Sequence, residues 1–312
     1  MKRVFMVGVI VSGLLMSIWI NNPETIEIQD WEKVQKIPSL YDKQMESWGY
    51  KSLNIQGNKV HKRIIKIAII DSGIDKSHPD IKGIVTKEYN AINPNNEIID
   101  DTGHGTAVAG IIGAIDDKKG IRGVSKSSNL EIYSIKAFEN SYSNEEIIKK
   151  ALRWAIDQNV DIINFSAGAS KANMELEKLI IEAINKDIFI ISAAGNKFNN
   201  ELQFPAYLPN VISVGAVNNE YKQVSGTVIK GVDFVGPGKG ILTTFPQKNY
   251  NYLGYTSSST AFVTGIVSDL LSQFSEFEVY HHDEIISILK DSAKKLKTND
   301  GTKVHFIQNS IR

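Results

Sequence analysis

Short β-branched segments alternate with helical patterns along most of this chain. The apolar, β-branched runs cover residues 64–70, 130–138, 160–168, 188–196 and 211–217, and the helical patterns cover residues 106–115, 144–159, 174–185, 257–274 and 282–293. Apolar runs bounded by Gly, Asn and Asp are typical of strands buried on both faces. The alternation predicts βαβ units and hence one α/β domain with a mostly parallel sheet. Ser143 and Glu146 have the spacing of a capping box, which predicts the start of the helix at 144–159.

The N-terminus differs from the rest of the chain. Lys2 and Arg3 precede residues 4–20, which carry no charge. A basic start followed by an apolar stretch is typical of an export signal, and a buried core helix is the alternative. We expect residues 1–22 to be a signal peptide or an uncleaved membrane anchor, residues 23–43 to be a short linker or arm, and residues 44–312 to form the domain.

Charge and cysteine content exclude several classes of function. The sequence has 35 basic and 35 acidic residues, so it lacks the basic excess that nucleic-acid-binding domains show. It has no cysteine, which excludes disulfides, thiolate metal sites and a cysteine nucleophile. We therefore expect no nucleic-acid partner.

Four polar sites stand where the pattern places strand ends or helix starts, which is where open α/β sheets gather their functional groups. Asp71 follows the first apolar run, His104 lies between two glycines before a helix of small residues, and Asn196 ends another apolar run. Three serines at 257–259 open a further helix. A desolvated carboxylate needs a partner, a rigid imidazole suits acid–base catalysis, an amide stabilises an oxyanion, and a serine beside a base is a nucleophile. Taken singly, each site also fits a cap, a turn or a packed residue.

In this order the four sites resemble the subtilisin-like serine proteases, the subtilase family, whose triad runs Asp, His, Ser along the chain. The resemblance is carried by DSGID at 71–75, HGTAVAG at 104–110, AAGN at 193–196 and TSSSTAFVTG at 256–265. It implies a single subtilisin-like domain with helices on both faces of the sheet, and it identifies Ser257 as the nucleophile. Tyr255 and Ala261 stand where the family has Gly and Pro.

The resemblance also implies a mechanism. His104 takes the proton of Ser257 as that residue attacks a peptide carbonyl, and Asp71 holds the imidazole and stabilises its charged form. Asn196 and the backbone N–H of Ser257 bind the oxyanion. No cofactor is required for this chemistry.

An extended substrate is implied to pair with residues 136–142 and with residues 166–168. The pocket for the residue before the scissile bond is then lined by Ser166, Ala167 and Gly168 on one side and by Ala193, Ala194 and Gly195 on the other. Lys197 is expected at its rim and Gln203 at its base. The absence of an acidic residue at these positions argues against a strong preference for Arg or Lys.

A structural calcium site is implied by the same resemblance. Gln44, Asp80 and Asp117 match the family's site by spacing, with Asp117 in the IDDKKGI loop at 115–121. Oxygen ligands suit a hard cation such as Ca²⁺. Lys118 and Lys119 in that loop argue for weaker binding.

The segment before the DSGID block is too short for a folded prodomain and is similar to that of the lantibiotic leader peptidases. This likeness predicts a monomeric enzyme, secreted or anchored to the outer face of the membrane, that removes the leader of a lantibiotic precursor peptide. A general extracellular protease and a catalytically inactive subtilisin-fold binding protein are the alternatives.

Overall fold

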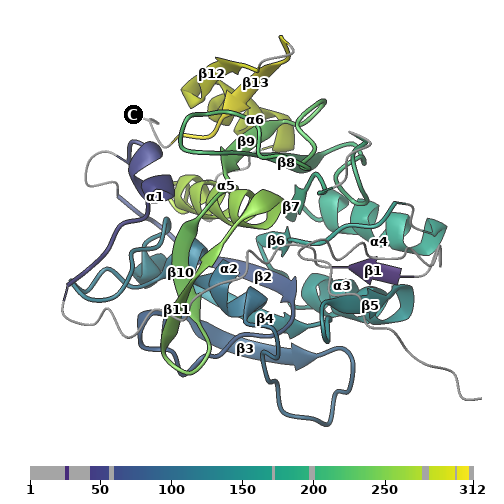
Figure 1. Cartoon of the computed structure of the whole chain (residues 1–312). Coiled ribbons are helices and arrows are strands. Elements are labelled where there is room, and N and C mark those ends of the chain that lie inside the picture. Colours follow the sequence, from purple (N-terminus) through teal and green to yellow (C-terminus); the bar gives the residue numbers. More distant parts are fainter. Residues whose placement is uncertain are drawn as a thin grey trace, which may run out of the picture.

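The fold is built around one large sheet, seen in a computed structural model (Figure 1) that describes residues 25–27, 43–55, 60–170, 173–196, 201–275, 281–298 and 301–308. Nine strands of the described residues lie in the order β12-β13-β9-β8-β7-β6-β2-β4-β3. Their bounds are β2 (Ile65–Asp71), β3 (Val85–Asn90), β4 (Leu130–Lys136), β6 (Ile162–Phe165), β7 (Phe189–Ala193), β8 (Val211–Val217), β9 (Phe234–Pro237), β12 (Lys294–Lys297) and β13 (Lys303–Phe306). All neighbours are parallel except β12 and β13.

Helices cover both faces of this sheet, as the resemblance implies. Their bounds are α1 (Trp48–Ser52), α2 (His104–Gly113), α3 (Glu145–Asp157), α4 (Met174–Asn185), α5 (Tyr255–Leu271) and α6 (His282–Ser292). Figure 1 shows α6, β12 and β13 gathered at one end of the molecule and β3 at the other, in agreement with the strand order. The predicted α/β class with a mostly parallel sheet is therefore confirmed.

The alternation of side chains along β2 separates two hydrophobic cores. Ile65, Ile67 and Ile69 pack with α2 and α5 on one face, whereas Ala68 and Ile70 pack with α3 and α4 on the other. Successive side chains of a strand point to opposite faces, so a strand buried on both faces must be apolar throughout. This is why the run at 64–70 shows no polar alternation.

Two smaller pairings lie outside the large sheet. The hairpin of β10 (Ile241–Phe245) and β11 (Asn249–Leu253) packs on α2, where the Thr243 and Thr244 hydroxyls donate to carbonyl groups of the helix. Strand β1 (Thr25–Glu27), within the predicted arm, pairs antiparallel with β5 (Tyr142–Asn144). No described helix is both long and apolar enough to cross a membrane. The predicted export signal at residues 1–22 lies outside the described residues.

Helix starts differ from the predicted ones for physical reasons. The Ser143–Glu146 capping box is wrong, because Asn144 is the N-cap of α3 and its side chain accepts from the N–H of Ile147. Ser143 belongs instead to β5. Helix α2 starts at His104 rather than after it, and α5 starts two residues before Ser257. The first residues of α2 and α5 are mostly small or hydroxylated, so they show no helical periodicity of apolar side chains. The pattern therefore predicted the start of both helices too late in the chain.

Candidate active site

Asp71 and His104 form a buried, hydrogen-bonded pair at the carboxyl end of β2. The Nδ1 atom of His104 lies 2.8 and 2.9 Å from the two carboxylate oxygens of Asp71. Both side chains are almost fully excluded from solvent. A carboxylate on Nδ1 fixes which imidazole nitrogen carries the proton, so that Nε2 is the nitrogen left to act as a base.

The chain around this pair allows an unusually close approach of α2 to the loop after β2. A Cβ atom on Gly105 would lie 2.0 Å from the carbonyl oxygen of Gly73 and 3.2 Å from the Cβ of Asp71. Any other residue at 105 would therefore push His104 away from its carboxylate. The glycine after the histidine is needed because the two backbones touch there.

Asp100 fixes the start of α2, and the sequence analysis did not single it out. Its carboxylate accepts from the N–H groups of Gly103 and Thr106, at 2.8 and 2.9 Å, and from the hydroxyls of Thr106 and Ser72. The Ser72 hydroxyl in turn accepts from the N–H of Gly105 at 3.1 Å. Burial raises the pKa of Asp100, and these hydrogen bonds oppose the rise. The acidic pair just before the His104 block was the only sequence hint of this role.

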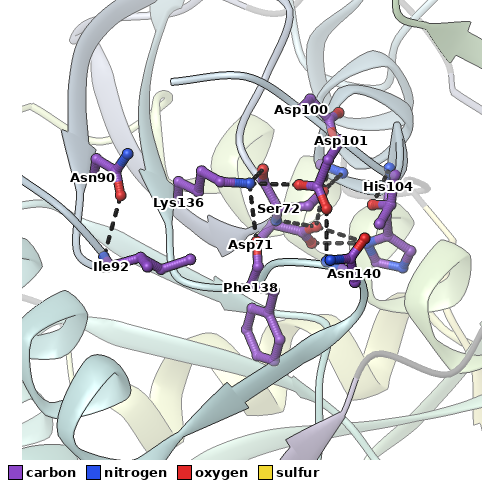
Figure 2. A network of polar contacts seen from close by, with 12 residues as sticks. Asp71, Ser72, Asn90, Ile92, Asp100, Asp101, His104, Lys136, Phe138 and Asn140 are labelled. Atoms are coloured by element: carbon purple, nitrogen blue, oxygen red, sulfur yellow. Dashed lines mark hydrogen bonds and ion pairs between the residues drawn. The ribbon is translucent and has the colours of Figure 1, made fainter. Parts of the chain in front are cut away.

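Lys136 lies behind the pair and joins three segments, as Figure 2 shows. Its Nζ donates to the carbonyls of Ser72 and Phe138, at 2.9 and 3.1 Å, and to the carboxylate of Asp101. Asp101 also accepts from the N–H of Asn140 at 2.6 Å. The side chain of a residue expected only as part of a substrate strand thus ties the ends of β2 and β4 to the loop before α2.

The three serines of α5 have different partners. The hydroxyl of Ser257 donates to the carbonyl of Ser166, beyond the end of β6, at 3.0 Å. Ser258 and Ser259 donate to the carbonyls of Pro237 and Gly236 in β9, at 3.1 and 3.0 Å. Ser257 is therefore the serine that faces the segment after β6, one of the predicted substrate walls, and its two neighbours anchor the helix to β9.

Asn196 lies beside the start of α5. Its side-chain oxygen accepts from the hydroxyl and the N–H of Thr256, at 2.8 and 3.3 Å. These bonds orient the amide so that its nitrogen is directed away from Thr256. Before it, Gly195 has a φ of +112°, a conformation that glycine alone adopts at no steric cost. The sequence pattern pointed to Asn196 but not to Thr256, the threonine that holds it.

Tyr255, one of the two departures from the family pattern, has a φ of +58°. This left-handed conformation is costly for a bulky residue, which explains why the family has Gly there. Its carbonyl accepts from the hydroxyls of Ser258 and Ser259, at 3.1 and 3.3 Å. Ala261, the other departure, is fully buried within α5.

The predicted walls of the substrate pocket follow β6 and β7. Ser166, Ala167 and Gly168 come after β6, and Ala193, Ala194 and Gly195 end or follow β7, its parallel neighbour. The side chain of Gln203 lies against the Cα atoms of both Gly168 and Gly195. Lys197, expected at the rim, lies outside the described residues.

The predicted calcium residues lie around the 115–121 loop, but one of them differs from the expectation. Gln44 was expected as an oxygen ligand, and it instead donates through its amide nitrogen to the carbonyls of Ile115 and Ile121, at 3.0 and 3.4 Å. Asp80 accepts from the N–H of Ile121 at 2.7 Å. Asp117 accepts from the N–H of Lys119.

The donor set at this loop suits a hard cation. Burial raises the pKa of Asp80 to about 6; hydrogen bonds from Ile121 and Tyr250 oppose the rise, and the charge of Asp117 adds to it. A cation would favour the charged form of both carboxyls. Within the described residues no cluster of three or more His, Asp or Glu side chains is suited to a metal, so backbone carbonyls would have to complete the site.

Comparison with known proteins places the chain among proteins of one family. A model of the subtilase family matches residues 62–308. The major intracellular serine protease of Bacillus subtilis strain 168 is 32% identical over 292 residues, which cover 88% of this chain and 86% of that protein. Subtilisin amylosacchariticus of Bacillus subtilis subsp. amylosacchariticus is 34% identical over 67% of this chain and 56% of its own length. Thermitase of Thermoactinomyces vulgaris is 32% identical over 67% of this chain and 75% of its own.

Proposed function

The chain belongs to the subtilase family and is a serine endopeptidase of the subtilisin type, and from this premise we propose that Asp71, His104 and Ser257 are its catalytic triad. The observation that carries the proposal is the buried pair of His104 Nδ1 and the Asp71 carboxylate, 2.8 Å apart. Helix α5, which bears Ser257, packs on α2, which bears His104.

The proposed reaction proceeds in two steps. The Ser257 hydroxyl gives its proton to His104 Nε2 while its oxygen bonds to the peptide carbonyl carbon. His104 then passes that proton to the departing amine as the C–N bond breaks, which leaves an ester on Ser257. Water, deprotonated by His104 in the same way, hydrolyses the ester. Asp71 remains ionised and stabilises the imidazolium in both steps.

A fluorophosphonate probe tests the nucleophile directly. We expect the wild-type protein to be labelled and Ser257→Ala not to be, because only a serine activated by a base reacts with this electrophile. Ser258→Ala and Ser259→Ala are matched controls in the same turn and are expected to be labelled. Equal labelling of Ser257→Ala and wild type would overturn the assignment.

Asn196 is proposed as the side-chain donor to the oxyanion. Removing one such donor from a subtilisin lowers turnover by about 10²–10³-fold. We expect Asn196→Ala to lower kcat by that order with little change in KM, because the donor acts on the transition state. A KM effect alone would show that Asn196 binds substrate and does not stabilise the oxyanion.

The narrower proposal for the substrate is the leader of a lantibiotic precursor peptide. It is supported by the likeness of residues 39–50 to the corresponding segment of the leader peptidases and by the departure at Tyr255. General degradation of proteins is the competing proposal, supported by likeness to proteins named subtilisin. Digestion of casein alongside a panel of lantibiotic precursor peptides separates the two. A single cut in a precursor with intact casein supports leader removal, and broad casein digestion supports the general protease.

Export is proposed from the basic start and the uncharged residues 4–20. One relative is named as an intracellular protease, so the location of this chain needs its own test. Fractionation of cells expressing the full chain, with N-terminal sequencing of the product, distinguishes the cases. Protein found only in the cytosol with its first residues intact would contradict export.

A structural calcium ion is proposed at the 115–121 loop. The residues that would hold it are Asp80 and Asp117, with the carbonyls that Gln44 now bridges, and the ion would stabilise the loop without taking part in catalysis. We expect EDTA to lower the melting temperature of the wild type and not that of Asp80→Asn. Asp116→Asn is the matched control, since Asp116 pairs with Arg122 instead. Equal EDTA shifts in wild type and Asp80→Asn would argue against this site.

A further inference from the structure

Gln203 occupies the space between the two walls that the family resemblance assigns to the residue before the scissile bond. We propose that Gln203 is a specificity-determining residue that restricts this position of the substrate to small side chains such as Gly, Ala and Ser. The inference rests on the proposed function, because it assumes that substrate is cleaved beside these walls.

The backbone at Gln203 is fixed to both walls by hydrogen bonds. The N–H of Gln203 donates to the carbonyl of Ala194 at 3.0 Å. The next residue, Phe204, exchanges two backbone hydrogen bonds with Ala169, at 2.8 and 3.3 Å. Residues 203 and 204 therefore join the segment after β6 to the segment after β7 and cannot move away from either one alone.

The side chain then fills the space that the glycines leave open. A Cβ atom on Gly168 would lie 2.4 Å from the Oε1 of Gln203 and 3.0 Å from its Cβ. A Cβ atom on Gly195 would lie 2.5 Å from Oε1 and 2.6 Å from both Cγ and Cδ. Carbon atoms in ordinary contact are about 3.5–4.0 Å apart, so no room for a further side chain remains between the glycines.

Rotation of the amide alone does not clear this space. The Cβ atom of Gln203, whose position the fixed backbone sets, is itself among the atoms in contact, and Cγ moves only if the whole side chain rotates about χ1. Gln203 as a whole residue is only 7% exposed, so rotating its side chain outward would expose buried surface. A large apolar or long basic side chain of the substrate would therefore collide with Gln203. A substrate side chain as small as the methyl group of Ala does not reach the space between the two walls.

Because the side-chain amide of Gln203 is neutral, two substitutions can test the effects of size and charge separately. Gln203→Gly removes the side chain, whereas Gln203→Glu keeps its size and adds a charge. If size decides the preference, Gln203→Glu leaves the ratio of Ala to Phe cleavage unchanged and Gln203→Gly alters it. If charge decides it, Gln203→Glu alters cleavage after Lys most, and Gln203→Gly, which changes no charge, leaves the ratio of Ala to Phe cleavage unchanged.

The experiment compares p-nitroanilide peptides that differ only in the residue before the scissile bond: Ala, Phe or Lys. One methylene in a pocket is worth about 10–200-fold in discrimination, so we expect wild type to favour Ala over Phe by at least tenfold in kcat/KM. Gln203→Gly is expected to raise kcat/KM for Phe at least tenfold and to change Ala less than threefold. Gln203→Glu is expected to keep the wild-type ratio.

The experiment distinguishes failure of the proposed function from failure of the proposed role of Gln203. Active sites of every variant are counted with the fluorophosphonate probe, and rates are divided by the labelled fraction, which removes effects of misfolding. Absence of labelling in the wild type means that the proposed function fails. Labelling with a wild-type preference for Phe, or with an unchanged ratio in Gln203→Gly, overturns the role of Gln203 alone.

Discussion

Lys136 places a buried charge behind the carboxylate of Asp71, the proposed triad member. Its ammonium group donates to the carbonyls of Ser72 and Phe138, and its partner Asp101 is bound to the N–H of Asn140. At the scale of single residues, Lys136 acts as a positioning residue, because it holds the backbone next to Asp71 and does not contact the reacting atoms.

Replacing Lys136 with Met should lower both the free energy of unfolding and kcat. Two backbone carbonyls and one carboxylate lose their buried donor, which costs about 3 kcal/mol of the free energy of unfolding. We expect kcat to fall more than KM rises, since the change displaces Asp71 and leaves the substrate walls intact. Chemical denaturation and steady-state kinetics measure the two effects. Adding Asp101→Asn should recover part of the stability, and no recovery would contradict the pairing.

Thr256 is expected to act through Asn196. Thr256→Val removes the hydroxyl that orients the amide oxygen, and we expect kcat to fall about tenfold. In the double variant with Asn196→Ala the threonine should have no further effect, because the group it orients is gone. Thr260→Val is the control, since that hydroxyl bonds only to a carbonyl of its own helix. Additive losses in the double variant would contradict the coupling.

At the scale of elements, the start of α3 shows how an apolar pattern and a cap can disagree by one residue. Ser143, predicted as the cap, pairs within β5, and its hydroxyl makes no hydrogen bond to any described group. Asn144 caps the helix because β5 ends there with extended backbone, from which a side chain can reach the N–H of Ile147.

Asn144→Ala is therefore expected to lower the free energy of unfolding by about 1 kcal/mol, the usual value of an N-cap. Ser143→Ala should be neutral or slightly stabilising, because it removes a buried hydroxyl without a bond. Both are measured by urea denaturation. The reverse order, with Ser143→Ala the more damaging, would favour the capping box read from the sequence.

At the scale of the whole molecule, the described sheet, both cores and the candidate site lie within residues 43–308. Strand β1 adds only a three-residue pairing with β5. Folding of this part depends on apolar burial between β2 and the helices on its two faces.

A chain that starts at Lys43 should therefore fold and retain its active site. We expect the same extent of fluorophosphonate labelling per molecule as in the full chain, and a melting temperature within a few degrees of it. Gln44 remains in this chain, so the 115–121 loop keeps its contact. Aggregation or loss of labelling on truncation would show that the preceding residues are required for folding.

The sequence by itself determined the mostly parallel sheet and the order of the four sequence blocks from which Asp71, His104, Asn196 and Ser257 are proposed as site residues. It did so because strands buried on both faces must be apolar throughout, and because the glycines and small residues around the site are required by close backbone contact. Only the tertiary structure decided which groups hold and restrict that site. Thr256 holds Asn196, Asp100 accepts from Ser72, and the side chain of Gln203 packs against Gly168. The two members of each pair lie far apart in the chain, and the fold alone brings them into contact.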